Sequence, residues 1–113
     1  MRNVLLIVLV ALAAVACTTQ KPLYNYAGYD EAIYTYTKNS DEKSVEQLLA
    51  VYEQMIKKTG SRQVPPPGLY ADYGFLLIQK GEVEKGKELL KKEIALYPES
   101  AHFVGLILKR VEK

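Results

Sequence analysis

The most informative stretch of the sequence is YADYGFLLIQKGEVEKGKELLKKEIALYP, residues 70–98. Large apolar residues recur in it at helical spacing, and Gly81 divides the pattern into two segments. Glycine just past a periodic segment ends a helix by adopting a left-handed cap, and proline cannot continue a helix. The stretch therefore predicts a helix over 69–80 and a second helix over 82–97 that ends at Pro98.

The same stretch resembles the tetratricopeptide repeat, a pair of antiparallel helices. The repeat's large, small and proline positions are matched in turn by Tyr70-x2-Tyr73-Gly74-x2-Leu77, Gly86-x3-Leu90 and Pro98. In that repeat, small residues let the two helices approach at their crossing while large residues fill the space around it. Gly86 and Glu93 depart from the pattern, because Ala is usual at both positions.

Two further helices are predicted before this pair and one after it. A short helix is indicated by residues that recur at i, i+3, i+4 and i+7, namely Tyr29, Ala32, Ile33 and Tyr36. A longer helix has its buried stripe at Val45, Leu48, Leu49, Tyr52, Met55 and Ile56, and a C-terminal helix at Phe103, Val104, Ile107, Leu108 and Val111. With no strand pattern in the sequence, the predicted fold is all-α, with about five helices in tetratricopeptide-like antiparallel pairs.

The ends of the longer helix carry several local signals. Residues 39–42 supply capping residues and first-turn acids, and Ser44 with Gln47 also fits a capping box. Gly60 is expected as the stop signal. Residues 61–68 contain three consecutive prolines, which favour an extended, semi-rigid connector to the next helix.

Composition limits the functions that the chain can have. Its 113 residues, 49 % hydrophobic and 25 % charged, fit one small domain. One Cys and one His exclude a disulfide framework and most zinc sites. A net charge of +2 without a long basic run gives no footprint for nucleic acid. No phosphate loop, metal-ligand spacing or nucleophile motif is present, so no cofactor, metal or small-molecule substrate is expected.

The N-terminal sequence is typical of an export signal. After Arg2 the chain is apolar from Val4 to Cys17, and this run of 14 residues extends about 21 Å as a helix, short of a bilayer core of roughly 30 Å. Ordinary signal peptidase could cut after the small-x-small sequence that ends at Ala16 and leave a soluble periplasmic adaptor. Ala14-Val15-Ala16-Cys17 also resembles the lipobox of bacterial lipoproteins, with Ala in place of the usual Leu.

The lipobox resemblance implies that Cys17 is acylated and becomes the first residue of the mature chain. Thr18 follows it instead of Asp, which by resemblance to the sorting rule of enteric bacteria favours the outer membrane over the inner one. The periplasmic face of that membrane is the expected side. The expected organisation is a lipoprotein signal peptide over 1–16, a lipid-anchored tether over 17–27 and a helical domain over 28–113. A lone exported thiol is otherwise a liability, which favours acylation over the soluble alternative.

A partner-binding surface is predicted on the helix over 69–80. Ala71, Phe75 and Ile78 share one face, which in tetratricopeptide arrays belongs to the concave groove and could receive a helix or an extended peptide. The alternative is that the first helix and the tether fill this groove within the same chain. Tyr34 lies outside the buried stripe of its own helix and is a second candidate for partner contact.

Three ionisable residues are the only candidates for catalysis, as in a small hydrolase: Asp72, Glu93 and His102. Glu93 shares a helical face with Leu90 and Tyr97. Its alternative role is a structural hydrogen bond or ion pair where the helix over 82–97 meets the C-terminal helix. A non-catalytic role is therefore expected, and His102 is predicted to be an exposed first-turn residue.

Almost the whole mature chain resembles an uncharacterised family of small lipoproteins from Gram-negative bacteria. The resemblance is carried by a tyrosine-rich start over 24–36, by Pro66-Pro67-Gly68-Leu69 and by Tyr97-Pro98-Glu99-Ser100. Members are often encoded next to a lipoprotein similar to the curli secretion channel. The resemblance implies a non-catalytic interaction or assembly subunit of an envelope complex, with envelope lipoproteins as partners.

Overall fold

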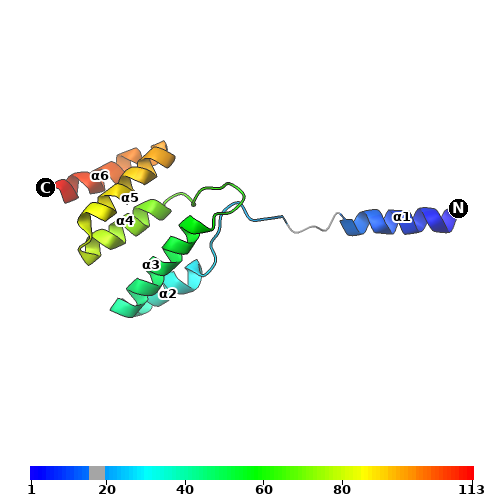
Figure 1. Cartoon of the computed structure of the whole chain (residues 1–113), viewed down its shortest axis with the longest axis horizontal. Helices are drawn as coiled ribbons and strands as arrows, with labels where there is room; N and C mark the ends of the chain where they lie inside the picture. Colours follow the sequence, from blue (N-terminus) through cyan, green and yellow to red (C-terminus); the bar gives the residue numbers. More distant parts are fainter. Residues whose placement is uncertain (16–19) are drawn as a thin grey trace.

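The computed structural model describes residues 1–15 and 20–113, and every regular element in them is helical (Figure 1). The elements are α1 (Arg2–Val15), α2 (Tyr29–Asn39), α3 (Glu42–Lys57), α4 (Leu69–Lys80), α5 (Val83–Leu96), the short 3₁₀ helix η1 (Pro98–Ser100) and α6 (Ala101–Glu112). The predicted all-α fold, with five helices after the N-terminal segment, is confirmed.

The helices after α1 form two antiparallel hairpins and a closing helix. α2 packs on α3, α4 packs on α5, α3 contacts α4, and α6 covers α5 (Figure 1). Each hairpin begins with a four-residue turn closed by a backbone hydrogen bond, from Tyr29 to the Tyr26 carbonyl and from Leu69 to the Pro66 carbonyl. Gly28 and Gly68 stand at the third position of these turns with φ of +78° and +91°, where a side chain would be strained.

The two hairpins do not follow a regular repeat. Their turn glycines are 40 positions apart, since 68 minus 28 is 40, whereas a tetratricopeptide repeat has a period of 34 residues. The extra length lies in the connector after α3, which runs from Lys58 to Gly68 before the second hairpin begins. This explains why the first two helices match the repeat spacing poorly while the second hairpin keeps that spacing, although Gly86 and Glu93 stand where alanine is usual.

The α4–α5 crossing is a contact between backbones. A Cβ built on Gly86 would lie 2.5 Å from the Gly74 carbonyl oxygen and 2.5 Å from Cγ1 of Ile78. Atoms of real side chains do not approach this closely, so both small residues are needed for the two helices to meet. Gly86, a departure from the repeat pattern, allows a closer approach than alanine would.

The start of α3 corrects one expectation. Asp41 is the N-cap, and its side chain accepts a hydrogen bond from the Ser44 backbone N–H at 2.8 Å, while the Ser44 hydroxyl accepts from the Asp41 N–H. The capping box therefore pairs Ser44 with Asp41, and the predicted box with Gln47 is wrong. Ser44 is buried because it is held in this reciprocal bond at the helix start.

Gly60 does not act as the stop signal that its position suggested. α3 ends at Lys57, and Gly60 is buried beneath the N-terminal segment of the domain without a left-handed φ. The Ser61 and Arg62 amides donate to the carbonyls of Pro22 and Leu23 at 2.9 and 3.1 Å. A Cβ on Gly60 would collide with the Leu23 carbonyl. The glycine is thus required by a close approach of two backbone segments that are distant in sequence.

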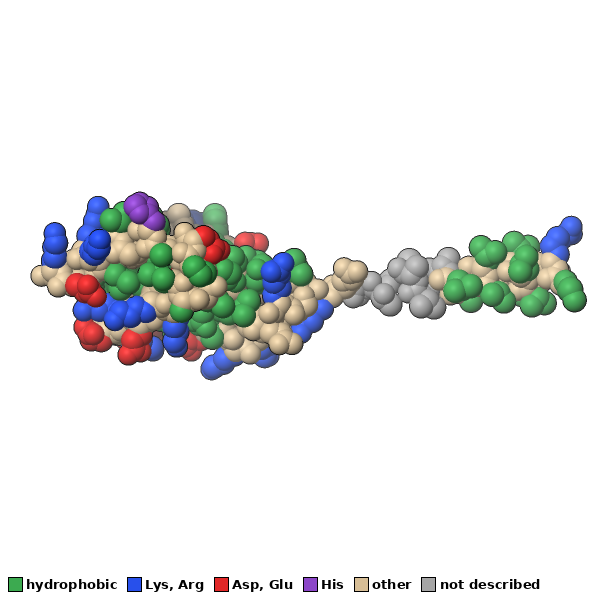
Figure 2. Space-filling model, turned by 90° about the horizontal axis from the view of Figure 1, so that it is seen from above, with side chains coloured by type: hydrophobic (Ala, Val, Ile, Leu, Met, Phe, Trp, Pro, Cys, Tyr) green, Lys and Arg blue, Asp and Glu red, His purple; other side chains and the backbone are tan. Residues whose placement is uncertain are grey.

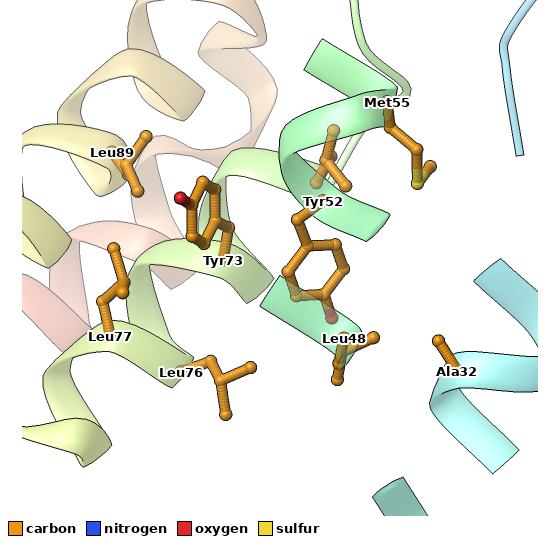
Figure 3. Close-up of a cluster of buried hydrophobic side chains, with 9 residues drawn as sticks. Ala32, Leu48, Tyr52, Met55, Tyr73, Leu76, Leu77 and Leu89 are labelled. Atoms are coloured by element: carbon orange, nitrogen blue, oxygen red, sulfur yellow. The ribbon is translucent and has the colours of Figure 1, made fainter. Parts of the chain in front are cut away.

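The core lies between the hairpins and includes a row of tyrosine rings. Tyr73 of α4 lies between Leu89 of α5 and Tyr52 of α3 (Figure 3). Ring centroids are 5.7 Å apart for Tyr52 and Tyr73 and 6.3 Å apart for Tyr29 and Tyr52. The row crosses from α2 to α4, so aromatic contacts join the two hairpins.

The N-terminal helix α1 is apolar and, at 14 residues, shorter than a bilayer-spanning helix. Within residues 1–15 and 20–113, no helix is both long enough and apolar enough to cross a membrane. Cys17, the predicted acylation site, lies outside the described residues, as does Thr18.

Candidate functional site

An open groove runs between α2 and α4. Two adjoining hollows of about 260 Å³ each share Tyr36, Leu76 and Gln79 in their walls. One continues toward the start of α3, and the other lies over Leu48 and Tyr52.

Phe75 is the most exposed aromatic side chain of this groove. It retains 45 % of its accessible surface although it stands beside Ile33 and Leu76 in a largely apolar wall. The N-terminal segment 22–25 is hydrogen-bonded to the connector after α3 and is not among the residues that line the groove. α2 supplies one wall but leaves the hollow open, so the groove is not filled in the way that the alternative expectation required.

Asp72 brings a negative charge into this apolar surface. Burial raises the pKa of its carboxyl group. Burial also raises the pKa values of Tyr52 and Tyr29, and the nearby Asp72 charge contributes to both shifts. Its carboxylate forms no ion pair within the described part of the chain. The groove therefore combines aromatic rings with a carboxylate that lacks a cationic partner, an arrangement that suits an ammonium or guanidinium group.

The other predicted contact residues lie in different places. Ile78 packs against Gly86 of α5, so it lines the hairpin interior, and Ala71 is half-buried. Neither lines the hollows described above. Tyr34 is exposed on α2, where the Lys38 ammonium lies 6.0 Å from its ring centroid. Of the four predicted residues, the structure places only Phe75 in the groove.

Glu93 and Tyr97 form a second cluster, which holds the proline-rich connector. Glu93 is 1 % exposed, and its Oε1 accepts a hydrogen bond from the Gly68 backbone N–H at 2.6 Å. The Tyr97 hydroxyl donates to the Pro65 carbonyl at 2.6 Å. Burial, followed by the neighbouring Tyr24 hydroxyl, raises the pKa of Tyr97 to about 12. The expected structural hydrogen bond of Glu93 is confirmed, but it reaches the start of α4 and not the contact with α6.

This cluster explains why the three sequence motifs occur together. The proline-rich motif contributes Pro65 and Gly68, the start of the domain contributes Tyr24, and the last motif contributes Tyr97. Because prolines carry no N–H, Gly68 supplies the first backbone donor after Val64. The proline-rich stretch and the last motif thus meet in a structural junction, whereas the tyrosine-rich start also reaches the groove through Tyr36.

The three candidate catalytic residues lie in different environments. Asp72 lines the groove, Glu93 is buried against Gly68, and His102 is exposed in the first turn of α6. No hydrogen bond joins any two of them in residues 1–15 and 20–113. Over the same residues, no group of three His, Cys, Asp or Glu side chains could hold a metal ion. The arrangement provides no acid–base pair from this trio.

A family profile described as a domain of unknown function, DUF4810, matches residues 23–107. The chain belongs to the DUF4810 family. The matched region begins in the segment that packs over Gly60 and ends in α6, so the DUF4810 domain includes this packed segment together with both hairpins. No curated protein and no solved structure matches the sequence.

The sequence singled out Asp72 as a catalytic candidate but did not place it in a groove with Phe75. Its position on α4 indicated a side chain facing water, together with Gln79. Both residues are exposed, as that position indicates, and both also line the open hollow beside Phe75. The signal that could have identified them is the tetratricopeptide register itself, since the face presented to the preceding hairpin includes them. Applying it requires the position of α2, which the irregular spacing of the first hairpin obscures.

Proposed function

We propose that this DUF4810 protein is a lipid-anchored lipoprotein of the outer membrane that docks a partner protein, as a non-catalytic subunit of a cell-envelope assembly. The observation that carries the docking role is the open groove between α2 and α4, in which Phe75 is 45 % exposed beside the Asp72 carboxylate, which has no ion pair among the described residues. Apolar surface with a rim of polar groups is typical of interaction sites.

The anchor is supported by the sequence around Cys17. The apolar segment that ends at the small residues before it is too short for a stable membrane span. The chain has one cysteine, at the position where acylation requires one. One acyl chain gives only marginal, reversible binding to a membrane. The three chains typical of a mature lipoprotein would therefore make release negligible.

Membrane attachment would strengthen docking without any additional contact. A protein confined to the same membrane as its partner meets it at a raised effective concentration, so a groove of this size suffices for a stable association. The family resemblance suggests envelope lipoproteins as the partners. Thr18 after the acylated residue supports the outer membrane over the inner one, by resemblance to the sorting rule of enteric bacteria, and the periplasmic face is the side that we propose.

Replacing Cys17 with Ser tests the anchor. The wild-type chain is expected to carry acyl groups on its N-terminal cysteine, to incorporate radiolabelled palmitate and to fractionate with the outer membrane. Cys17→Ser removes the acceptor thiol, so the variant is expected to lose the label and leave that fraction. Mass spectrometry of the mature N-terminus reads the result directly. A wild-type chain with an unmodified Cys17 thiol would support the soluble periplasmic adaptor instead.

The groove chemistry specifies the partner segment. We propose a helix or an extended peptide that places an apolar side chain beside Phe75 and a Lys or Arg side chain at Asp72. The aromatic rings of Tyr52 and Tyr36 lie in the same hollow and favour a cation there. A basic group would also restore to Asp72 a favourable interaction that its burial has weakened.

Replacing Asp72 with Asn is expected to weaken docking tenfold or more, because a hydrogen bond to a charged group contributes about 1.5–3 kcal/mol. The measurement is photo-crosslinking in native membranes from a probe at position 75. The crosslink should depend on Asp72 and survive the same change at Asp30, which is exposed on α2. Equal yields from the two variants would contradict a cation at Asp72.

Asp72→Asn is expected to weaken docking but to stabilise the folded domain. A carboxyl group with a raised folded pKa destabilises the folded state once ionised, so Asp72→Asn should unfold at a higher urea concentration than wild type at neutral pH. The difference is complete above the folded pKa and disappears as pH falls below the unfolded value near 4. Loss of docking from a stabilised protein separates binding from unfolding.

A further inference from the structure

We propose that one end of the domain lies against anionic phospholipid headgroups of the membrane that holds the protein. We call this end the basal surface and define it as Lys21, Leu23, Tyr26, Lys57, Lys58 and Arg62. The proposal rests on the lipid anchor proposed above, because acylation at Cys17 is what brings this end to a bilayer.

Backbone hydrogen bonds assemble the basal surface from two segments. Arg62 and Ser61 donate to the carbonyls of the N-terminal segment, and the Asn25 side chain donates to the Lys58 carbonyl at 2.6 Å. Gly60 lets the segments touch, since a Cβ there would collide with the Leu23 carbonyl. The basic residues at the end of α3 and in the connector are therefore fixed beside Leu23 and Tyr26.

The composition of this surface matches an anionic lipid interface. Its four basic side chains make no ion pair in the described residues. Leu23 and Tyr26 are 57 % and 51 % exposed, and apolar and tyrosine side chains favour the interfacial region of a bilayer. Figure 2 shows Lys and Arg side chains at the end of the domain from which the chain leads to α1, and also at the opposite end, where Asp and Glu side chains stand among them. The carboxylates nearest along the sequence are Glu53, four positions before Lys57 on α3, and Asp30, and within the described residues neither forms an ion pair with this surface.

The reach of the chain keeps this surface close to the membrane. Five peptide units separate Cys17 from Pro22, and fully extended they span at most about 18 Å. The Pro22 carbonyl accepts a hydrogen bond from the Ser61 N–H, so the connector at Ser61 is held at nearly the same maximum distance from Cys17. Each Lys or Arg near an anionic surface strengthens association about fivefold. The four charges together would hold the domain in one orientation.

That orientation would direct the groove away from the lipid. The hollow that includes Ser40 and Glu42 lies at the start of α3, and the hollow that holds Phe75 lies over Leu48 and Tyr52 in its middle, whereas Lys57 and Lys58 stand at its end. The 16 residues of α3 extend about 24 Å. A partner could then enter the groove without competing with the bilayer for the same surface.

The test uses the acylated protein in vesicles of phosphatidylcholine alone or mixed with phosphatidylglycerol. A fluorescent label is attached at Ser61→Cys or, as a control position, at Lys113→Cys. Acylation of Cys17 leaves the introduced cysteine as the only free thiol. Quenching by a nitroxide on the lipid headgroup is expected to be several-fold stronger at position 61 when phosphatidylglycerol is present, and unchanged at position 113.

A pair of variants with identical composition changes completes the test. Lys58→Ser with Arg62→Ser should lower the ratio of docked to undocked domain about 25-fold, and high salt should have a similar effect. Lys109→Ser with Arg110→Ser, on α6, should retain the quenching. Suppose that the acylated protein shows the same quenching with and without phosphatidylglycerol, or that the two double variants lower it equally. Either result would contradict the basal-surface proposal and leave the lipid anchor standing. A mature chain whose mass shows no acyl group overturns the anchor and this proposal with it.

Discussion

Gly86→Ala is expected to destabilise the protein by about 2 kcal/mol, although alanine is the better helix former by up to about 1 kcal/mol. The new methyl group would stand 2.5 Å from both the Gly74 carbonyl oxygen and the Ile78 side chain. Ile78 could change its rotamer, but the carbonyl belongs to the backbone of α4 and can move only with the helix. The measurement is urea unfolding of the purified protein, followed by the helical circular dichroism signal.

Gly105→Ala is the matched control. Gly105 lies in the middle of α6, and a Cβ built on it meets no atom within 4 Å. The same substitution there should raise stability by about 0.5–1 kcal/mol, since only helix propensity changes. Opposite signs at the two glycines would locate the effect at the α4–α5 crossing. A Gly86→Ala protein as stable as Gly105→Ala would show that the two hairpin helices can separate without loss.

The second hairpin was predictable from sequence because its signals are local. Gly81 and Pro98 mark the ends of the two helices, and α4 and α5 lie within a residue of the predicted ranges. Helix stops and apolar periodicity act over a few residues, so one sequence contains all the information needed. The small residues at the crossing were likewise identified by their spacing, and the Gly74–Gly86 contact confirms their role.

The packing of Pro22 and Leu23 on the connector could not be predicted in the same way. It consists of backbone hydrogen bonds between segments almost forty positions apart, and backbone groups are the same in every residue. Gly60 was the sign of this contact in the sequence, but a glycine just after a helix is equally expected when it caps that helix. Only the position of the second segment separates the two explanations.

The groove shows the same limit for side chains. Phe75 and Ile78 share one face of α4 by their spacing, yet Phe75 meets solvent while Ile78 fills the space that Gly86 leaves open. The periodicity of a single helix gives the direction of a side chain and not the neighbour that occupies that direction. The placement of Asp72 in the groove depends equally on where α2 lies.

Glu93→Leu is expected to destabilise the protein by about 2–3 kcal/mol, the second large effect. Leucine keeps the buried site filled but removes the acceptor of the Gly68 N–H, and an unsatisfied buried donor costs about 1–3 kcal/mol. The three prolines before Gly68 offer no donor that could take over the contact, and the connector is then held mainly through Pro65 and Tyr97. Unfolding in urea gives the loss of stability, and hydrogen exchange of the Gly68 amide gives its cause.

Glu93→Gln separates hydrogen bonding from packing. Glutamine keeps a carbonyl oxygen at the position of Oε1 and has nearly the same volume, so the protein should stay within about 1 kcal/mol of wild type and the Gly68 amide should remain protected. Oε2 has no hydrogen-bond partner among the described residues, so replacing it removes no bond there. If leucine and glutamine gave equal stability and equal protection of Gly68, then burial of volume alone would account for this residue. If only glutamine retained both, the hydrogen bond that the side-chain oxygen accepts from Gly68 would be established as the contact that joins the end of α5 to the start of α4.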